Sequence, residues 1–469
     1  MNIPSGPDTG QAGAPLTAVP EPVVIQENDH PIRLHDLDKE ALKVLYRLRD
    51  AGHVGYLVGG GVRDLYLGKK PKDFDISTDA RPGQLRKLFR NSRTIGRRFR
   101  LVQVFFRGGK IIEVSTLRCQ NEYESDAERP EEEIEVLPAN NTFGTVAEDA
   151  QRRDLTINSL FYEIEKRTII DYVGGVRDLD RGIIRITGEP DRRVTRDPVR
   201  MMRAVRHAAR TGFCIEPATW KAIVANREKL RLCPPSRIRD ELLKDLRSGA
   251  SEPWARIALD SSLFFTLFPW YAEIPLLEED SPQRRLLLSL LAVVDRLQQL
   301  PLHDVRVEMP DYLLLALLVL PWADARFDLL RQQLKGPEHY RFSREIRQSL
   351  DEIFGEHFNL KRMAKDAMTT LLVNLPAFVQ FSRHNSWPNW LRKKSYFRDG
   401  LRFFSLYSEA VGGAPADEQQ FTVAVDVGGP EHDFLPLPPI TGENGSSGRK
   451  ASRPAFTNRK RGVFGLRNK

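Results

Sequence analysis

Short apolar runs separated by turn residues characterise the N-terminal part of the chain, and longer runs with helical spacing follow them. Asp38 is a suitable N-cap for a helix in which Leu42, Leu45 and Leu48 share one face. A short helix is expected over 62–67, where Gly68 ends it. Strands are expected at 56–58, 74–77, 101–106 and 110–116.

From Asp197 the pattern becomes helical and stays so to about residue 410. Asp197 followed by Pro198 predicts an N-cap and the first turn of a helix. The apolar helices expected at 286–294 and 312–320 would form the core of an all-α part. The fold class predicted is therefore an α+β head followed by all-α neck and body domains.

The predicted boundaries divide the chain into five parts. Residues 1–30 are rich in Pro, Gly, Ala and Thr and are expected to be disordered. The like-charged acidic segment 122–135 inside the head is expected to be a mobile loop. The parts are the N-terminal segment 1–30, head 31–172, neck 173–254, body 255–410, and a linker with a basic tail, 411–469.

Composition favours a folded cytoplasmic protein. Of 469 residues, 41% are apolar, yet the longest uncharged apolar run, 312–323, is too short to cross a bilayer. The first basic residue is Arg33, so no secretory signal is expected. Three scattered cysteines do not suffice for a disulfide framework or a thiolate metal site.

The net charge of +8 is concentrated in two tracts. Residues 445–469 carry eight Lys or Arg and no acid, and residues 81–118 carry eleven Lys or Arg and a single acid, Glu113. Two basic tracts on one chain point to nucleic acid as a partner.

A strand, a glycine turn and a helix at 56–67 form an arrangement that can bind phosphates. Glycine permits close approach of the backbone, and the first free amides of the helix offer donors to an anion. Gly60, Gly61 and, two residues into the helix, Arg63 are the candidates for binding a triphosphate. The segment is not a P-loop, because Gly68-Lys69 lacks the required glycine before it and hydroxyl residue after it.

Asp73 and Asp75 are two apart on a predicted strand, so their carboxylates project to one face. Adjacent carboxylates repel each other unless a cation lies between them, and oxygen ligands beside a phosphate site suit Mg²⁺. Glu113, on another apolar strand, is either a third carboxylate of this group or a partner of nearby arginines.

Two further segments carry polar chemistry. Arg152, Arg153, Asp154 and Asn158 suit a ribose and its phosphates. Asp197 and Arg200 can present an acceptor and a donor to the edge of a base, and Arg203 and Arg206 follow on the same helical face. The candidate nucleotide-binding residues are thus Gly60, Gly61, Arg63, Arg153, Asn158, Asp197, Arg200, Arg203 and Arg206.

In this order the segments resemble class II nucleotidyltransferases, the family of bacterial poly(A) polymerases and tRNA CCA-adding enzymes. The resemblance runs from about Leu37 to Gly249. It rests on four motifs: LVGGGVRD at 57–64, KDFDI at 72–76, RRDLTIN at 152–158 and DPVRM at 197–201. The family implies a catalytic nucleotidyltransferase head, a neck that binds the base and RNA, and a helical body.

The resemblance implies that Asp73 and Asp75 hold two Mg²⁺ ions that activate the RNA 3′-hydroxyl and steady the triphosphate of ATP. Asp154 would be a further catalytic acid, and whether it or Glu113 completes the metal cluster stays open. The base would be read by Asp197 and Arg200, with Arg203 and Arg206 supporting the pocket. One departure is Arg196, where the family usually has Glu.

The segment IGRRFRLVQV at 95–104, the neck segment PPSRIRDELL at 234–243 and the basic tail favour a poly(A) polymerase acting on RNA 3′ ends. A tRNA CCA-adding enzyme is the alternative. A catalytically dead RNA-binding protein would lack Asp73 or Asp75, and both are present. Partners in RNA degradation or RNA chaperoning leave no signal in the sequence.

Overall fold

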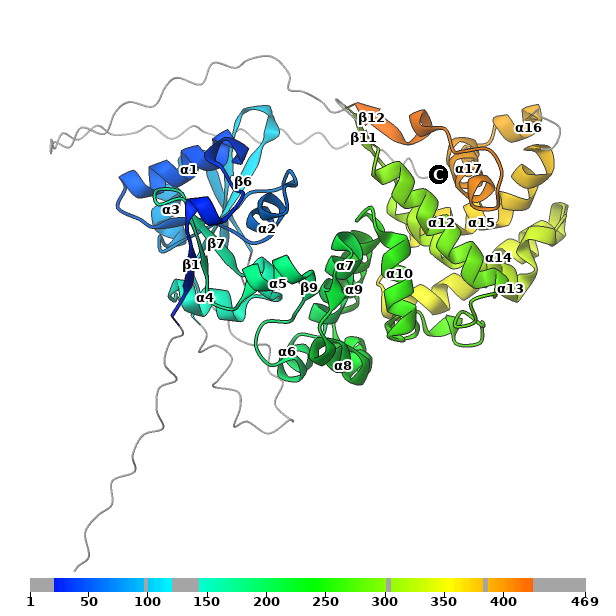
Figure 1. The fold of residues 1–469 in the computed structure, drawn as a ribbon. Helices are drawn as coiled ribbons and strands as arrows, with labels where there is room; N and C mark the ends of the chain where they lie inside the picture. Colours follow the sequence, from blue (N-terminus) through cyan, green and yellow to red (C-terminus); the bar gives the residue numbers. More distant parts are fainter. Residues whose placement is uncertain (1–20, 97–99, 120–142, 301–304, 383–386, 425–469) are drawn as a thin grey trace, which may run out of the picture. The chain divides into compact units, whose positions relative to one another are not determined.

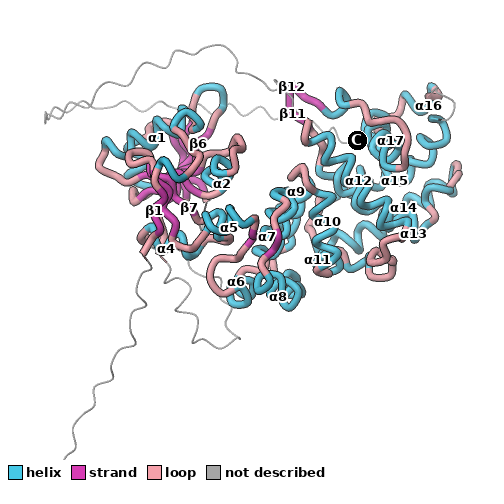
Figure 2. Tube along the Cα trace, in the orientation of Figure 1, coloured by secondary structure: helices cyan, strands magenta, loops and turns pink. Residues whose placement is uncertain are grey.

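The computed structural model describes residues 21–96, 100–119, 143–300, 305–382 and 387–424. An α+β head is followed by a helical region, as predicted, and the main sheet is confined to the head (Figures 1 and 2). The acidic segment 122–135 and the basic tail 445–469 lie outside the described residues. Within the described residues, no helix is both long and apolar enough to span a membrane.

One mixed sheet organises the head. Its strand order is β1-β8-β7-β2-β3-β6-β5-β4, with β3 and β6 parallel and the other neighbours antiparallel. The strands are β1 (Val23–Ile25), β2 (Gly55–Val58), β3 (Asp75–Thr78), β4 (Ser92–Ile95), β5 (Leu101–Phe105), β6 (Ile111–Thr116), β7 (Leu160–Glu163) and β8 (Thr168–Asp171).

Short helices connect and cover these strands. Asp38 caps α1 as predicted, since its carboxylate accepts from the backbone N–H of Glu40 at 2.9 Å and of Ala41 at 3.1 Å. Leu45 and Leu48 are buried on the face of α1 that packs against the sheet. The helices of the head are α1 (Lys39–Asp50), α2 (Gly60–Tyr66), α3 (Pro82–Leu88), α4 (Val146–Arg152) and α5 (Gly175–Arg181).

The helical region begins with α6 and includes two short strand pairs. The helices predicted at 286–294 and 312–320 are α12 and α13, whose apolar side chains are buried. β9 (Ile183–Ile184) pairs in parallel with β10 (Cys214–Ile215), and β11 (Val305–Val307) pairs antiparallel with β12 (Thr422–Ala424). The helices are α6 (Pro190–Arg196), α7 (Val199–Thr211), α8 (Pro217–Asn226), α9 (Pro235–Leu246), α10 (Ser251–Asp260), α11 (Leu263–Leu267), α12 (Pro282–Gln298), α13 (Asp311–Phe327), α14 (Gly336–His357), α15 (Arg362–Ser382), α16 (Asn389–Arg392) and α17 (Phe397–Ala410).

The prediction that residues 1–30 are disordered is wrong for residues 21–30. Val23 to Ile25 form β1, paired with β8 in the register Val23 to Asp171. Three residues are too few to show a strand period, and their partner lies far along the chain, so the pattern gave no signal. Residues 1–20 lie outside the described residues. At the other end, β12 carries ordered structure past the predicted end of the body at 410.

Candidate active site

The glycine turn joins β2 to α2 in a way that side chains would obstruct. Gly59 has φ +69° and ψ −139°, a backbone conformation that residues with a Cβ rarely adopt. A Cβ on Gly61 would lie 3.3 Å from the backbone oxygen of Asp73. The turn therefore packs the first residues of α2 directly against the segment that carries Asp73.

The three predicted carboxylates gather at one end of the parallel pair β3 and β6. Asp75 begins β3 and lies in register with Glu113 on β6, while Phe74 and Ile76 are buried. Asp73 precedes the strand and is exposed. Burial raises the pKa of Asp75 to about 6; the Glu113 and Asp73 carboxylates add to the rise and Arg153 opposes it.

Glu113 has a neighbour on its other side, because Gln103 of β5 donates from Nε2 to Glu113 Oε1 at 3.0 Å. This bond fixes one Glu113 oxygen, and among the residues that the structure describes no arginine lies within ion-pair distance of Glu113. The geometry thus brings Glu113 beside Asp75.

These carboxylates fit a magnesium ion by their chemistry. Mg²⁺ is usually held in proteins by one or two carboxylates, together with water and substrate phosphates. Within the described ranges, no group of three or more His, Cys, Asp or Glu side chains stands ready to hold a metal ion. Two carboxylates beside the glycine turn meet this lower requirement, and the pKa of Asp75 is raised first by burial and then by the neighbouring carboxylates.

Arg152 and Arg153 share one buried carboxylate that the sequence analysis missed. Asp149 on α4 is 1% exposed and accepts from Arg152 Nε at 2.8 Å and Arg153 Nη2 at 2.9 Å. Burial works to raise the pKa of Asp149, but the Arg153 and Arg152 guanidiniums outweigh it and hold the pKa below its usual range.

Arg153 is fixed on other sides as well. Its guanidinium stacks on the Phe161 ring with Cζ 5.0 Å from the ring centroid, and its Nη2 donates to Ser77 Oγ at 3.2 Å. Asp149 was recognisable, because the capping box of Thr145 and Glu148 begins a helix that places Asp149 three and four residues before the arginines.

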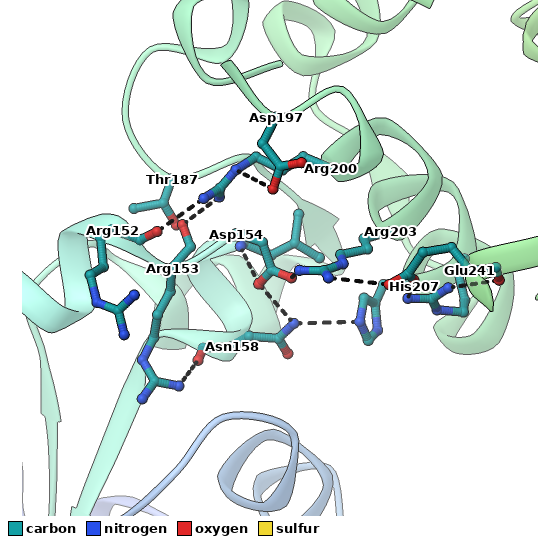
Figure 3. A network of polar contacts seen from close by, with 12 residues as sticks. Arg152, Arg153, Asp154, Asn158, Thr187, Asp197, Arg200, Arg203, His207 and Glu241 are labelled. Atoms are coloured by element: carbon teal, nitrogen blue, oxygen red, sulfur yellow. Dashed lines mark hydrogen bonds and ion pairs between the residues drawn. The ribbon is translucent and has the colours of Figure 1, made fainter. Parts of the chain in front are cut away.

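Asp154 faces cations of α7 (Figure 3). Its Oδ1 accepts from the Leu155 backbone N–H at 2.8 Å, and its Oδ2 pairs with Arg203 Nη1 at 3.4 Å. Burial works to raise the pKa of Asp154, but Arg203, His207 and Arg200 outweigh it and hold the pKa far below the usual range. Its charge is compensated from within the protein, unlike that of Asp75.

Arg63 does not extend from the glycine turn toward solvent. It is 3% exposed, and its Nη1 donates to Asn158 Oδ1 at 2.6 Å and to His207 Nδ1 at 3.3 Å. Its Nη2 also donates to Asp64 at 2.7 Å. The two predicted nucleotide-binding residues Arg63 and Asn158 are therefore brought together, bonded to each other.

His207 is a member of this network that the sequence analysis missed. Burial lowers its pKa to about 3; the Arg63 charge adds to this fall and Asp154 opposes it. Both ring nitrogens of His207 face donors, Nδ1 the Arg63 Nη1 at 3.3 Å and Nε2 the Asn158 Nδ2 at 3.4 Å, and a neutral imidazole can accept at one of them. A lone histidine on a helix with many arginines gives no sequence signal for such a role.

The predicted N-cap role of Asp197 is wrong. Asp197 directly follows the last residue of α6. Pro198, with φ −60° and ψ −24°, occupies the position before α7, and no side chain caps that helix. The proline ring already holds a helical φ, and the Asp197 carboxylate pairs with Arg237 Nη2 at 2.8 Å instead. Its Oδ2 also lies 3.8 Å from Arg200 Nε, so the predicted base-reading pair is adjacent.

The arginines of α7 are bonded to protein groups. Arg200 donates to the backbone oxygens of Arg153 at 2.8 Å and Arg152 at 3.1 Å (Figure 3). Arg203 and Arg206 both pair with Glu241 of α9, at 3.1 and 2.6 Å. These bonds join the helix to its neighbours, which is a structural role that the sequence prediction did not include.

Arg206 has a second carboxylate partner, Asp245, at 2.8 Å. The two carboxylate partners of Arg206 differ in pKa. Asp245 is fully buried, and burial raises its pKa to about 7 against the opposing charge of Arg206. The pKa of Glu241, which faces Arg206, Arg203 and Lys244, falls to about 2 because these cations outweigh its burial.

Two family descriptions match the chain: "Poly A polymerase head domain" over residues 55–185, and "Probable RNA and SrmB- binding site of polymerase A" over 212–274. Poly(A) polymerase I from Escherichia coli O6:H1 is 42% identical over 337 residues, which cover 71% of this chain and 71% of that protein. The chain belongs to the bacterial poly(A) polymerase family. This membership confirms the resemblance to class II nucleotidyltransferases.

The family's CCA-adding relatives are more distant. A CCA-adding enzyme from Bacillus velezensis is 37% identical over 213 residues, 45% of this chain and 51% of that enzyme. The crystal structure of the Bacillus stearothermophilus CCA-adding enzyme in complex with CTP has a TM-score of 0.57 and 25% identity, and covers 81% of this chain and 79% of that chain. This similarity confirms the predicted fold class, an α+β head followed by helical domains.

Proposed function

We propose that the chain is a template-independent polynucleotide adenylyltransferase that transfers AMP from ATP to RNA 3′ ends. The observation that carries the proposal is the group of carboxylates Asp73, Asp75 and Glu113 beside a glycine turn, in a chain of the poly(A) polymerase family. In the reaction the RNA 3′-oxygen loses its proton and forms a bond to the α-phosphorus of ATP. The bond from the α-phosphorus to the oxygen that bridges to the β-phosphate breaks, and pyrophosphate leaves with that electron pair.

Asp73 and Asp75 are the residues that would hold Mg²⁺, with Glu113 beside them. Bound there, the metal would supply positive charge to the reacting phosphate and lower the pKa of the attacking hydroxyl. The family's two-ion arrangement is part of the proposal.

The chain's own residues orient the triphosphate. We assign its binding to the first backbone amides of α2 at Gly60 and Gly61, where the turn packs against the segment of Asp73. Hydrogen bonds to Asp149 and Ser77 hold Arg153 in place. Its positive charge acts on the Asp75 carboxylate and opposes the rise of that group's pKa. A guanidinium fixed in this way loses little entropy when a phosphate binds.

We assign base reading to Asp197 and Arg200, which lie side by side at the start of α7. Asp197 now pairs with Arg237, and Arg200 donates to backbone oxygens. On binding, hydrogen bonds from these two side chains to the edge of adenine would replace those contacts. Arg63, Asn158, Arg203 and Arg206 are proposed to act by supporting this pocket through the bonds described above.

RNA as the second substrate is supported by the matched family region at 212–274 and by the basic composition of 445–469. Poly(A) addition is favoured over CCA addition because the identity to the poly(A) polymerase is higher and extends over a longer stretch, 337 against 213 residues.

Nucleotide addition by the purified protein tests the proposal. A generic RNA and a tRNA lacking its CCA end are each incubated with Mg²⁺, first with ATP alone and then with CTP and ATP. A ladder on generic RNA with ATP alone is the expected result. Addition that requires CTP, stops after three nucleotides and demands tRNA would identify the CCA-adding alternative.

A further inference from the structure

A basic pocket of about 490 Å³ lies beside the segment that carries Asp73. Its walls come from the loop before β3, from α7 and from α9 and the residues that follow it. The lining residues are Lys72, Arg206, Arg210, Asp240, Leu243, Lys244, Arg247 and Ser248.

Several charges of this pocket are compensated within the protein. Arg206 is neutralised by Glu241 and Asp245. Lys244 shares Glu241 at 3.2 Å. The remaining two pairs are Arg247 with Asp311, and Asp240 with Arg239. None of these ion pairs includes the other two cations of the pocket, Lys72 and Arg210.

Lys72 and Arg210 are the cations left over. Neither has a carboxylate within ion-pair distance in the part of the chain that the structure describes. The Arg210 side chain is exposed at the pocket, and its pKa is lowered first by partial desolvation and then by the like charges of Arg63 and Arg206, opposed by Asp64. Arg210 is therefore held among cations, and an anion in the pocket would relieve that repulsion.

We propose that Lys72 and Arg210 bind a backbone phosphate of the RNA strand that is being extended, an inference that rests on the proposed function. An RNA strand continues beyond its reacting 3′ end, so its phosphates need cations outside the metal-binding carboxylates. Lys72 adjoins Asp73 in the chain, and Arg210 comes from the far end of the helix that begins near the base-reading pair. Exposed Lys and Arg side chains are the usual phosphate contacts of proteins that position a strand without reading its sequence.

The triphosphate of ATP carries the same chemistry, so the test separates the two sources. Arg210→Gln, Lys72→Gln and the charge-retaining Arg210→Lys are compared with the intact chain. Lys394→Gln serves as the matched control, because Lys394 is exposed, outside the pocket and outside the matched region 212–274. Steady-state addition gives KM separately for RNA and for ATP, and thermal unfolding confirms that each variant is folded.

Binding is also measured without catalysis, by fluorescence anisotropy of a labelled oligoadenylate in buffer with a chelator and no ATP. Arg210→Gln and Lys72→Gln are each expected to weaken RNA binding about five- to tenfold and to reduce the salt slope by about 0.7. The KM for RNA of these two variants rises equally, while their KM for ATP changes less than about twofold. In Arg210→Lys and in Lys394→Gln, RNA binding and both KM values change less than about twofold.

A rise in the KM for ATP with unchanged RNA binding would assign the pocket to the triphosphate and overturn the inference. Unchanged RNA binding and unchanged KM values in both glutamine variants would overturn it as well. Because the anisotropy measurement needs no turnover, an intact chain that binds RNA at this pocket but adds no nucleotide would refute the proposed function alone.

Discussion

Two carboxylates in different regions of this molecule, Asp75 at the end of β3 and Glu241 on α9, have pKa values that shift in opposite directions. At the end of β3, burial and the neighbouring Glu113 raise the pKa of Asp75 to about 6. On α9, the cations Arg206, Arg203 and Lys244 outweigh burial and lower the pKa of Glu241 to about 2. The first group, around Asp75, has one cation acting on it, Arg153, whereas in the second group three cations act on Glu241. The contrast separates charges that await a ligand from charges that hold helices together.

The largest expected effect comes from removing a charge of the first group. Asp75→Asn keeps the size of the side chain but removes a metal-binding oxygen, so we expect single-turnover AMP addition to fall at least about a thousandfold. Asp79→Asn is the matched control, since Asp79 is exposed just past the other end of β3. Activity of Asp75→Asn within tenfold of the intact chain would remove Asp75 from the active site.

Breaking the second group should cost stability. Arg206→Met leaves Glu241 and Asp245 without their main cation, and we expect the free energy of unfolding to fall by about 3–5 kcal/mol. Arg210→Met, one turn later on α7 and with no carboxylate partner, is the control and should change it by less than about 0.5 kcal/mol. Denaturant unfolding followed by circular dichroism measures both, and equal losses would contradict the contrast.

The contributions of Asp75 and Glu241 to the free energy of unfolding should depend on pH with opposite signs. Because the folded state raises the pKa of Asp75, its stabilising contribution is complete below pH 3.8 and is lost as the pH rises through about 6. Asp75→Asn in buffer with a chelator should therefore match the intact chain near pH 4 and exceed it by about 2–3 kcal/mol above pH 6. A stability difference that does not grow with pH would refute the assignment.

Glu241 should behave in the reverse way, since its folded pKa is lowered. Its contribution is present above pH 4.5 and is lost as the pH falls through about 2. Denaturant unfolding at a series of acidic pH values would show Glu241→Gln destabilising the chain above pH 4.5 and approaching the intact chain at lower pH.

The smallest expected effect concerns the basic tail, whose eight cations have no acid near them in the sequence. Deletion of 445–469 should weaken RNA binding about tenfold and flatten its salt dependence, because each phosphate contact releases counterions. AMP addition at saturating RNA should persist. Anisotropy across a range of salt concentrations measures this, and an unchanged salt slope would exclude the tail from RNA binding.

Local patterns predicted the elements that surround the site. Four strands, the glycine turn and the Asp38 cap follow from spacing within a few residues, and the structure confirms them. Membership of the family also followed from motifs that are local in the sequence. Asp75 begins β3 as predicted, but Asp73 precedes the strand, so the prediction that both lie on one strand is wrong for Asp73.

The partners of the arginines could not be predicted in this way. Helical spacing places Arg203 and Arg206 on one face of α7, but it does not show that Glu241, thirty-five residues after Arg206, faces them. Asp197 was misassigned because its competing partner, Arg237, is forty residues away. The roles assigned to these residues in binding nucleotide therefore remain predictions.

The short strand β1 has a consequence for how the protein behaves when shortened. Val23 to Ile25 cover the outer side of β8, whose Ile169 is fully buried. A chain cut at residue 31, where the sequence pattern places the start of the head, would present a bare row of backbone donors and acceptors along β8. Open edges of this kind recruit strands from other molecules, so such a truncated chain would self-associate through β8 while the carboxylates at the end of β3 stayed in place.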